Sequence, residues 1–244
     1  MEIIAIVPAR LGSKSIKNKN ITKLGKHPLL AYSIMAAGLS SYIDKVVVST
    51  DSEEIATISK EYGAQVPFLR PVEISQDYST DMEFFEHFIS FNKKNKIEIP
   101  DFIVHLRPTT PLRNISVLDR GIELLLQNNK ATGLRSVYPS SISPYKVFKM
   151  EGFFLKGFFP DDSRNEYYNL PRQEFPQTYT PNGYVDIIKI STIKSGVLHG
   201  SKILGYKVDH VPDIDTPEDF IYAEECLDDK RFSILVNELK DLYG

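Results

Sequence analysis

Two groups of charged residues, one near each end of the chain, could do chemistry together. The segment from Ile3 to Ile43 contains no acidic residue and six basic ones, at positions 10, 14, 17, 19, 23 and 26. The whole 244-residue chain has a formal charge of −3, so this local positive charge runs against the average. A cationic loop that follows a strand suits a polyanion such as a triphosphate, whereas many basic runs simply face water.

Gly12 and Ser13 favour the phosphate interpretation of this loop. A glycine beside a small hydroxyl residue lets backbone N–H groups come close to phosphate oxygens. The chain contains neither the G-x-x-x-x-G-K-S/T pattern of P-loop NTPases nor the G-x-G-x-x-G pattern of dinucleotide sites. The sequence therefore predicts a phosphate-binding loop of another kind.

The second group is Asp213 and Asp215, which alternate around Ile214. In an extended backbone both carboxylates point to one side, where they can hold Mg²⁺, a cation that needs only one or two carboxylates plus phosphate oxygens. We expect metal or catalytic duty for Asp215 first and Asp213 second. Zinc-type histidine spacing and a G-x-S-x-G elbow are both missing from the sequence. The remaining equipment is that of magnesium-dependent nucleotidyl transfer.

Alternating strand and helix patterns predict the elements that position these groups. Buried apolar runs indicate strands at 3–8, 45–50, 65–69 (weaker, because of Pro67), 102–106, 134–138, 183–190 and 203–208. Helices are expected at 28–38, from a cap at Asp51 to Gly63, from Thr80 to about 91, from Ser116 to about 128, from Thr216 to about 228 and at 232–242. This order predicts an α/β fold, a mostly parallel sheet flanked by helices, in a single domain spanning 1–244.

The segment at about 139–182 interrupts this order and is rich in Tyr, Phe and Pro. A long stretch without helical periodicity inside a compact domain is usually functional or an interaction arm. Alternation between 145 and 159 suggests a hairpin, and we interpret the segment as a dimerisation arm. The alternative is that the segment folds back on its own core.

Composition limits the partners and the location. The pI near 6.0 argues against general nucleic-acid binding, and no apolar run approaches the roughly 18 residues that a membrane span needs. The lone Cys226 cannot form an internal disulfide and is expected in a packed helix, and Met1 and Glu2 lead straight into the first strand. We therefore expect a cytoplasmic protein with a small-molecule partner.

Several short motifs, taken in order, resemble those of the acylneuraminate cytidylyltransferases, also called CMP-sialic acid synthetases. They are ARLGSKSIKNKN (9–20), VSTD (48–51), RP (70–71), PTTPLR (108–113), PRQ (171–173), PNG (181–183) and DIDT (213–216). The resemblance implies a Rossmann-like nucleotidyltransferase that forms a homodimer through its arm. The implied reaction joins CTP to a nonulosonic acid, a nine-carbon α-keto acid sugar, with Mg²⁺ as cofactor, and gives the CMP-sugar and pyrophosphate.

The same resemblance implies roles for individual residues. The catalytic residues would be Lys14, Lys19 and Asp215, and the metal ligands Asp213 and Asp215. The nucleotide would be bound by Ala9, Arg10, Gly12, Ser13, Lys14, Lys19, Asn20, Arg70, Ser79 and Thr80. The sugar would be bound by Arg107, Thr109, Arg172, Asn182 and Asp186, with Arg172 delivered by the arm to the partner's site.

Departures from the family pattern bear on the acceptor. Members that act on N-acetylneuraminate commonly have Gln, Arg and Tyr where this chain has Arg107, Thr180 and Asp186. These differences change charge in the proposed sugar pocket, so we expect another nonulosonate, of the legionaminic or pseudaminic type, and favour the legionaminic type. The alternatives are a 3-deoxy-octulosonate cytidylyltransferase, a sugar-1-phosphate nucleotidyltransferase and a non-catalytic nucleotide-binding regulator.

Overall fold

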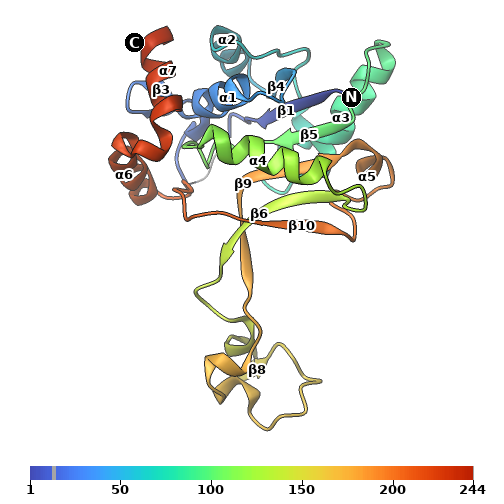
Figure 1. The fold of residues 1–244 in the computed structure, drawn as a ribbon, viewed down its shortest axis with the longest axis vertical. Coiled ribbons are helices and arrows are strands. Elements are labelled where there is room, and N and C mark those ends of the chain that lie inside the picture. Colours follow the sequence, from blue (N-terminus) through green and yellow to red (C-terminus); the bar gives the residue numbers. More distant parts are fainter. Residues whose placement is uncertain (13–14, 244) are drawn as a thin grey trace.

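The computed structural model describes residues 1–12 and 15–243, so the predicted site residues Ser13 and Lys14 lie outside the described residues. A six-stranded sheet forms the centre of the molecule, in the order β10-β6-β9-β5-β1-β4 (Figure 1). Its strands are β1 (Ile3–Pro8), β4 (Lys45–Ser49), β5 (Phe102–His105), β6 (Gly133–Pro139), β9 (Tyr179–Lys189) and β10 (Ile203–Lys207). Only β9 runs antiparallel to its two neighbours among these described strands. The predicted mostly parallel sheet is confirmed.

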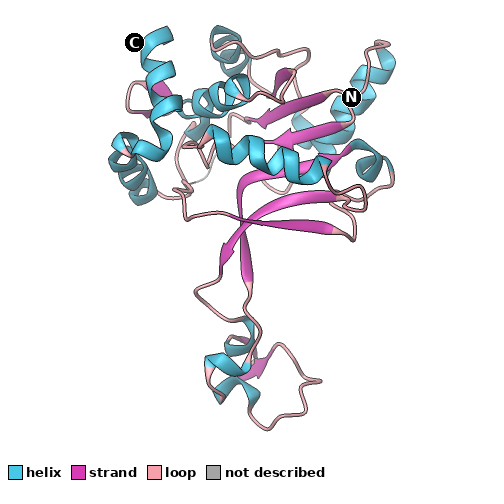
Figure 2. Ribbon diagram, viewed as in Figure 1, coloured by secondary structure: helices cyan, strands magenta, loops and turns pink. Residues whose placement is uncertain are grey.

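Helices cover both faces of the sheet (Figure 2). They are α1 (Leu29–Leu39), α2 (Glu53–Glu61), α3 (Asp81–Lys94), α4 (Ile115–Leu126), α5 (Ile190–Lys194), α6 (Pro217–Glu225) and α7 (Ser233–Tyr243). Because side chains of a strand alternate between faces, Ala5 and Val7 of β1 pack in a core with α1, α4 and α7. Ile4 and Ile6 pack in a second core with α3 and α5. The cleft described below therefore stands on a sheet buried on both sides.

Two helix starts follow the predicted capping pattern and two differ. Thr80 and Thr216 both form capping boxes, as expected. Asp51 was the wrong cap for α2, because its carboxylate accepts the backbone N–H of Leu11 and the neighbouring Ser52 caps the helix instead. The Ser116 assignment was also wrong. Its own backbone N–H donates to the side chain of Asn114, which is the actual cap of α4.

Two predictions near the sheet edge and α1 also need correction. The segment 65–69 forms only isolated bridges, Val47 with Gln65 and Thr50 with Leu69, because Pro67 between them lacks the N–H that a ladder needs. Pro28 is the cap of α1 and not its first residue, and Gly38 lies inside the helix. Pro28 belongs instead to the small hairpin of β2 (Lys23–Leu24) and β3 (His27–Pro28).

The segment between β6 and β9 extends away from the sheet as an arm (Figure 1). It contains a hairpin of β7 (Phe148–Glu151) and β8 (Phe154–Gly157), so the hairpin expected at 145–159 is confirmed. Tyr145 stacks between Phe159 and Phe175, with ring centroids 4.2 and 4.8 Å away. The arm is thus organised by its own aromatic residues. Among residues 1–12 and 15–243, every helix is too short or too polar to cross a bilayer.

Candidate active site

A cleft of about 520 Å³ opens beyond the carboxyl ends of β1 and β5, where an open α/β sheet binds ligands. Of the residues predicted for the site, ten line this cleft: Arg10, Gly12, Lys19, Asn20, Arg70, Ser79, Thr80, Arg107, Thr109 and Asp215. Segments far apart in the chain therefore share one cavity. Its other lining residues include Ser75, Gln76, Asp77, Asp81 and Phe84.

Lys19 joins the amino-terminal loop to the acidic pair. Its ammonium donates to the backbone carbonyl of Ile214 at 2.7 Å and lies 3.2 Å from the Asp215 carboxylate. Lys19 is 8% exposed and belongs to the 3-10 helix η1 (Lys19–Ile21), which follows Asn18 in the left-handed conformation. The side chain is thus held in place before any ligand arrives, and its charge lies beside the predicted metal ligands.

The two aspartates are placed by the peptide between them. Ile214 is fully buried, and its backbone N–H donates to the Thr109 carbonyl at 2.7 Å. Asp213 accepts from Thr110 at 3.4 Å while Asp215 meets Lys19. Loss of hydration, with the charge of Asp215 added, raises the pKa of Asp213 above its ordinary value. Two neighbouring carboxylates suit Mg²⁺ completed by phosphate and water, and no cluster of three or more such ligands occurs in the described chain.

Arg70 presents a buried cation to the cleft. It is 6% exposed, and its guanidinium lies 5.7 Å from the centre of the Phe84 ring. Within the residues that the structure describes, its Nε and Nη2 have no hydrogen-bond partner. Burial lowers the pKa of Arg70, the usual sign that a charge has lost its hydration. A buried guanidinium with spare N–H groups is equipped to bind a ligand's acceptor atoms.

The loop after β1 is tied down by neighbouring side chains. The Leu11 N–H donates to Asp51, and the Asn20 side-chain amide donates to the Arg10 carbonyl at 2.8 Å. The Arg10 guanidinium forms an ion pair with Asp77 at 2.7 Å across the cleft. A bound polyanion would therefore compete with Asp77 for Arg10.

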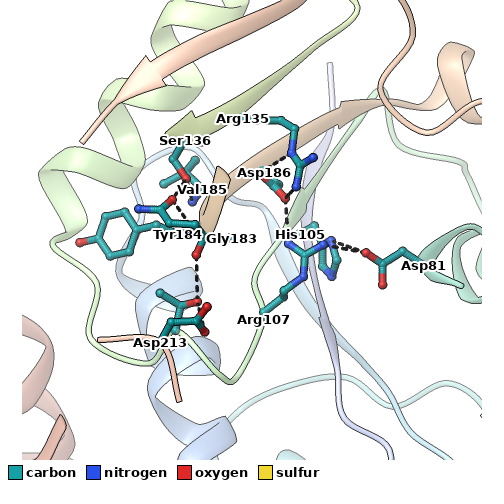
Figure 3. Close-up of polar contacts among 12 residues, drawn as sticks. Asp81, His105, Arg107, Arg135, Ser136, Gly183, Tyr184, Val185, Asp186 and Asp213 are labelled. Atoms are coloured by element: carbon teal, nitrogen blue, oxygen red, sulfur yellow. Dashed lines mark hydrogen bonds and ion pairs between the residues drawn. The ribbon is translucent and has the colours of Figure 1, made fainter. Parts of the chain in front are cut away.

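Arg107 stands at the centre of an ion-pair cluster at another part of the cleft (Figure 3). Its Nη1 donates to Asp186 at 2.8 Å and its Nη2 donates to Asp81 at 2.7 Å. Arg135 also donates to Asp186, at 3.3 Å. His105 is buried 3.8 Å from Asp81, but burial lowers its pKa well below the ordinary value, so we treat it as neutral. Burial lowers the pKa of Arg107, but the two carboxylates outweigh this effect and raise it overall.

Five predicted residues of the described chain lie away from the cleft lining, and one of them is Asp213, which neighbours the lining residue Thr109 through Thr110. Ala9 is fully buried, and its N–H continues the sheet by donating to Ser49. Asp186 is fully buried behind Arg107. Asn182 accepts from Ser136 at 2.6 Å, inside the sheet. Arg172 lies on the arm and donates to the Ser140 carbonyl. The structure thus does not bring Arg172 to the cleft of its own chain.

Sequence reasoning missed Asp77, Asp81 and Arg135. Asp81 occupies the first turn of α3, where acids are common for helix-dipole reasons alone, so its position gave no signal of a second role. Asp77 lies next to the predicted motif residues 79 and 80, which was the available hint. Arg135 belongs to a strand that pairs with β9, and that pairing cannot be read from local pattern.

Comparison with known proteins places the chain in a family. Residues 4–170 match the family model described as Cytidylyltransferase. The chain belongs to the cytidylyltransferase family. An N-acylneuraminate cytidylyltransferase of Escherichia coli O18:K1:H7 is 32% identical over 87% of this chain and 47% of its own length. A CMP-N,N'-diacetyllegionaminic acid synthase of Legionella pneumophila is 38% identical over 59% of this chain and 61% of its own.

The chain spans about half the length of these curated relatives, 47% and 61%. Among solved structures, a CMP:2-keto-3-deoxy-manno-octonic acid synthetase complexed with CTP superposes with a TM-score of 0.67. It is 12% identical, and the match covers 93% of this chain and 98% of that one. The expected Rossmann-like nucleotidyltransferase fold is confirmed by this similarity.

Proposed function

We propose that this protein is a magnesium-dependent cytidylyltransferase that joins CTP to a nonulosonic acid and releases pyrophosphate. The observation that supports it most directly is the Lys19 contact with Ile214 and Asp215, in the cleft that Arg70 also lines. The basic groups would then bind the triphosphate and the acidic groups its cation, so both would contact the same magnesium nucleotide. The curated relatives named above are a cytidylyltransferase and a CMP-sugar synthase, which agrees with this proposal.

The proposed reaction is an in-line displacement at the α-phosphorus of CTP by the anomeric hydroxyl of the sugar. Arg10, Lys19 and the loop amides hold the triphosphate, so the charge that develops on the leaving pyrophosphate meets fixed positive groups. Mg²⁺ held by Asp213 and Asp215 would offset the same charge. Asp215 also orients the attacking hydroxyl and accepts its proton. Ser13 and Lys14 join the triphosphate site in this proposal, with Lys14 in a catalytic role.

The nucleoside is assigned to Arg70, Ser79 and Thr80, which line the cleft together. The spare N–H groups of Arg70 supply donors for carbonyl or phosphate oxygens. Arg107 and Thr109 face the acceptor sugar, and we favour a legionaminic-type nonulosonate. The similarity to a diacetyllegionaminic acid synthase supports that choice over an octulosonate.

A pyrophosphate-release assay tests this function. Purified protein is given CTP, Mg²⁺ and each of a panel of nonulosonates and octulosonates, with UTP and GTP as controls. We expect release with CTP and a nonulosonate, loss of release when EDTA removes Mg²⁺, and at least about a hundredfold loss in Asp215→Asn. Glu218→Gln, an exposed acid close by on α6, is the matched control. Tight CTP binding without release from any acceptor would favour the regulator instead.

We infer that the arm joins two copies of the chain. Phe153 and Phe154 at the tip of the hairpin are 97% and 80% exposed. Leaving two adjacent aromatic side chains in water is unfavourable and unusual for a monomer. A second copy would cover them and could place the partner's Arg172 at the sugar end of this cleft. The assignment of 1–244 as one domain with an inserted arm at about 139–182 belongs to the same proposal. The cytoplasmic location stays a prediction.

A further inference from the structure

The cluster around Arg107 contains two guanidiniums and two carboxylates, so its formal charges cancel (Figure 3). Asp186 is fully buried between Arg107 and Arg135, whereas Arg107 and Asp81 line the cleft. Side-chain exposure is 27% for Arg107 and 36% for Asp81. One end of the cleft therefore presents a donor and an acceptor side by side, without net charge.

We propose that Arg107 and Asp81 form a neutral clamp for a secondary amide, the N-acyl substituent of the acceptor sugar, and that Asp186 is the positioning residue of this clamp. The proposal rests on the proposed function and deepens it by naming a group on the acceptor. It also changes the role of Asp186, from a residue that touches the sugar to one that acts through Arg107.

The hydrogen-bonding capacity of the clamp matches an amide. A guanidinium has five N–H donors, and the bonds from Arg107 to the two carboxylates use two of them. Asp81 uses Oδ2 for Arg107 and retains lone pairs on Oδ1. A secondary amide offers one C=O acceptor and one N–H donor. Its carbonyl would accept from Arg107, and its N–H would donate to Asp81.

A carboxylate fits this end of the cleft less well. Arg107 already shares its charge with two acids, so a third acid would meet Asp81 and Asp186 as like charges at close range. A free amine on the sugar would be repelled by Arg107 while being attracted to Asp81. The cluster thus favours an uncharged group that both donates and accepts.

The backbone supports the position of Arg107 in three ways. On β9, Asp186 is paired with His105 of β5 and with Arg135 of β6, so strand register puts the carboxylate under both guanidiniums. The Arg107 carbonyl accepts from the buried Arg113 at 3.0 Å. Gly183 has φ +64°, and a Cβ there would lie 3.3 Å from both Cδ and Nη1 of Arg107. A side chain at 183 would therefore press on the guanidinium.

Steady-state kinetics on Asp186→Asn tests the positioning role. The variant leaves the cluster with one excess positive charge and removes the buried partner of Arg107. We expect the KM for an N-acyl acceptor to rise about 10- to 100-fold, the loss expected for hydrogen bonds to charged groups, with the KM for CTP unchanged. If Arg107 bound a carboxylate of the sugar, the excess charge would lower the acceptor KM. An unchanged or lowered acceptor KM therefore overturns the proposal.

Gly183→Ala is the second variant, because it keeps every charge, although it strains the left-handed backbone at 183 as well as crowding Arg107. It should raise the acceptor KM and spare the KM for CTP. Glu86→Gln removes an exposed acid from the same helix as Asp81 and should change neither value. Thermal melts show that each variant is folded at the assay temperature. A rise in both KM values, or a fall in kcat alone, would indicate a merely structural role and overturn the clamp.

Acceptor analogues test the chemical group directly. We expect wild-type protein to prefer the N-acyl sugar over the same sugar with a hydroxyl or a free amine at that carbon, and Asp81→Asn to lose most of this preference. Pyrophosphate release with the same preference in Asp81→Asn overturns the clamp alone. No release from wild-type protein with any acceptor overturns the proposed function, and the clamp with it.

Discussion

Replacing Lys19 with methionine should weaken both the fold and the reaction, by separable amounts. Methionine keeps much of the apolar stem and removes the ammonium. The bond from that ammonium to the Ile214 carbonyl is 2.7 Å long and buried, and a bond from a charged donor contributes about 1.5–3 kcal/mol. The Asp215 side chain is 76% exposed, so its ion pair adds at most about 1 kcal/mol. We expect the free energy of unfolding to fall by about 2–4 kcal/mol.

The fall corresponds to a melting temperature lower by about 5–15 °C for a chain of this size. Thermal unfolding followed by circular dichroism measures it, with Lys23→Met, an exposed lysine nearby, as the matched control. Asp215→Asn combined with Lys19→Met should show a coupling below about 1 kcal/mol, since the carbonyl and not the carboxylate carries the stability. A coupling energy of several kcal/mol would contradict the prediction that the Ile214 carbonyl, and not the Asp215 carboxylate, accounts for most of the stability that Lys19 adds.

Turnover in Lys19→Met should fall by about 10²–10³-fold at a temperature where the variant is folded, the loss seen when one positioned charge is removed from a developing anion. Pyrophosphate release is the assay. A variant that melts within about 1 °C of wild type and turns over within a factor of two would refute the placement of Lys19 in the site.

Three further predictions follow from single contacts. Asp77→Asn should free Arg10 and tighten CTP binding in calorimetry by about two- to fivefold, the range for a partly exposed ion pair, and weaker binding would show that Asp77 helps to hold the ligand. Burial lowers the pKa of His105, so below about pH 6.5 the unfolded chain binds a proton that the native state does not, and the free energy of unfolding should fall as the pH drops. His105→Leu should remove about 1.4 kcal/mol per pH unit of this dependence, measured by urea unfolding. An equal pH dependence in both proteins would contradict the prediction. Phe153→Glu with Phe154→Glu should turn a dimer into a monomer in light scattering without changing the melting of the domain, and a monomeric wild type would refute the arm proposal.

Local patterns were enough to predict most elements, because strand and helix periods differ and a capping box has fixed spacing. The boxes at Thr80 and Thr216 formed as expected. The caps at Asp51 and Ser116 failed because another good capping residue stood close to each, Ser52 beside Asp51 and Asn114 two positions before Ser116. Asp51 was taken by the Leu11 N–H, a contact 40 residues distant that no local pattern contains.

The site divides in the same way. The contact of Lys19 with Asp215 was within reach of sequence reasoning, since opposite charges at strand ends meet at one edge of a sheet. The cluster of Arg107, Asp81 and Asp186 was not, because it depends on the antiparallel insertion of β9 between β5 and β6. Asp186 was therefore expected to touch the sugar, whereas its side chain is buried under Arg107.

The contrast between two arginines in one cleft suggests how its two ligands are kept apart. Arg70 is buried with Nε and Nη2 unpartnered among the described residues, so it retains both charge and donors for a ligand. Arg107 is satisfied by two carboxylates and offers donors without net charge. The acceptor oxygens of CTP, on its base and its phosphates, gain most where donors and positive charge are uncompensated, whereas a neutral amide gains from hydrogen bonds that need no counterion. In the proposed function, the number of acids beside each arginine, more than the arginines themselves, would therefore determine which ligand each end of the cleft selects.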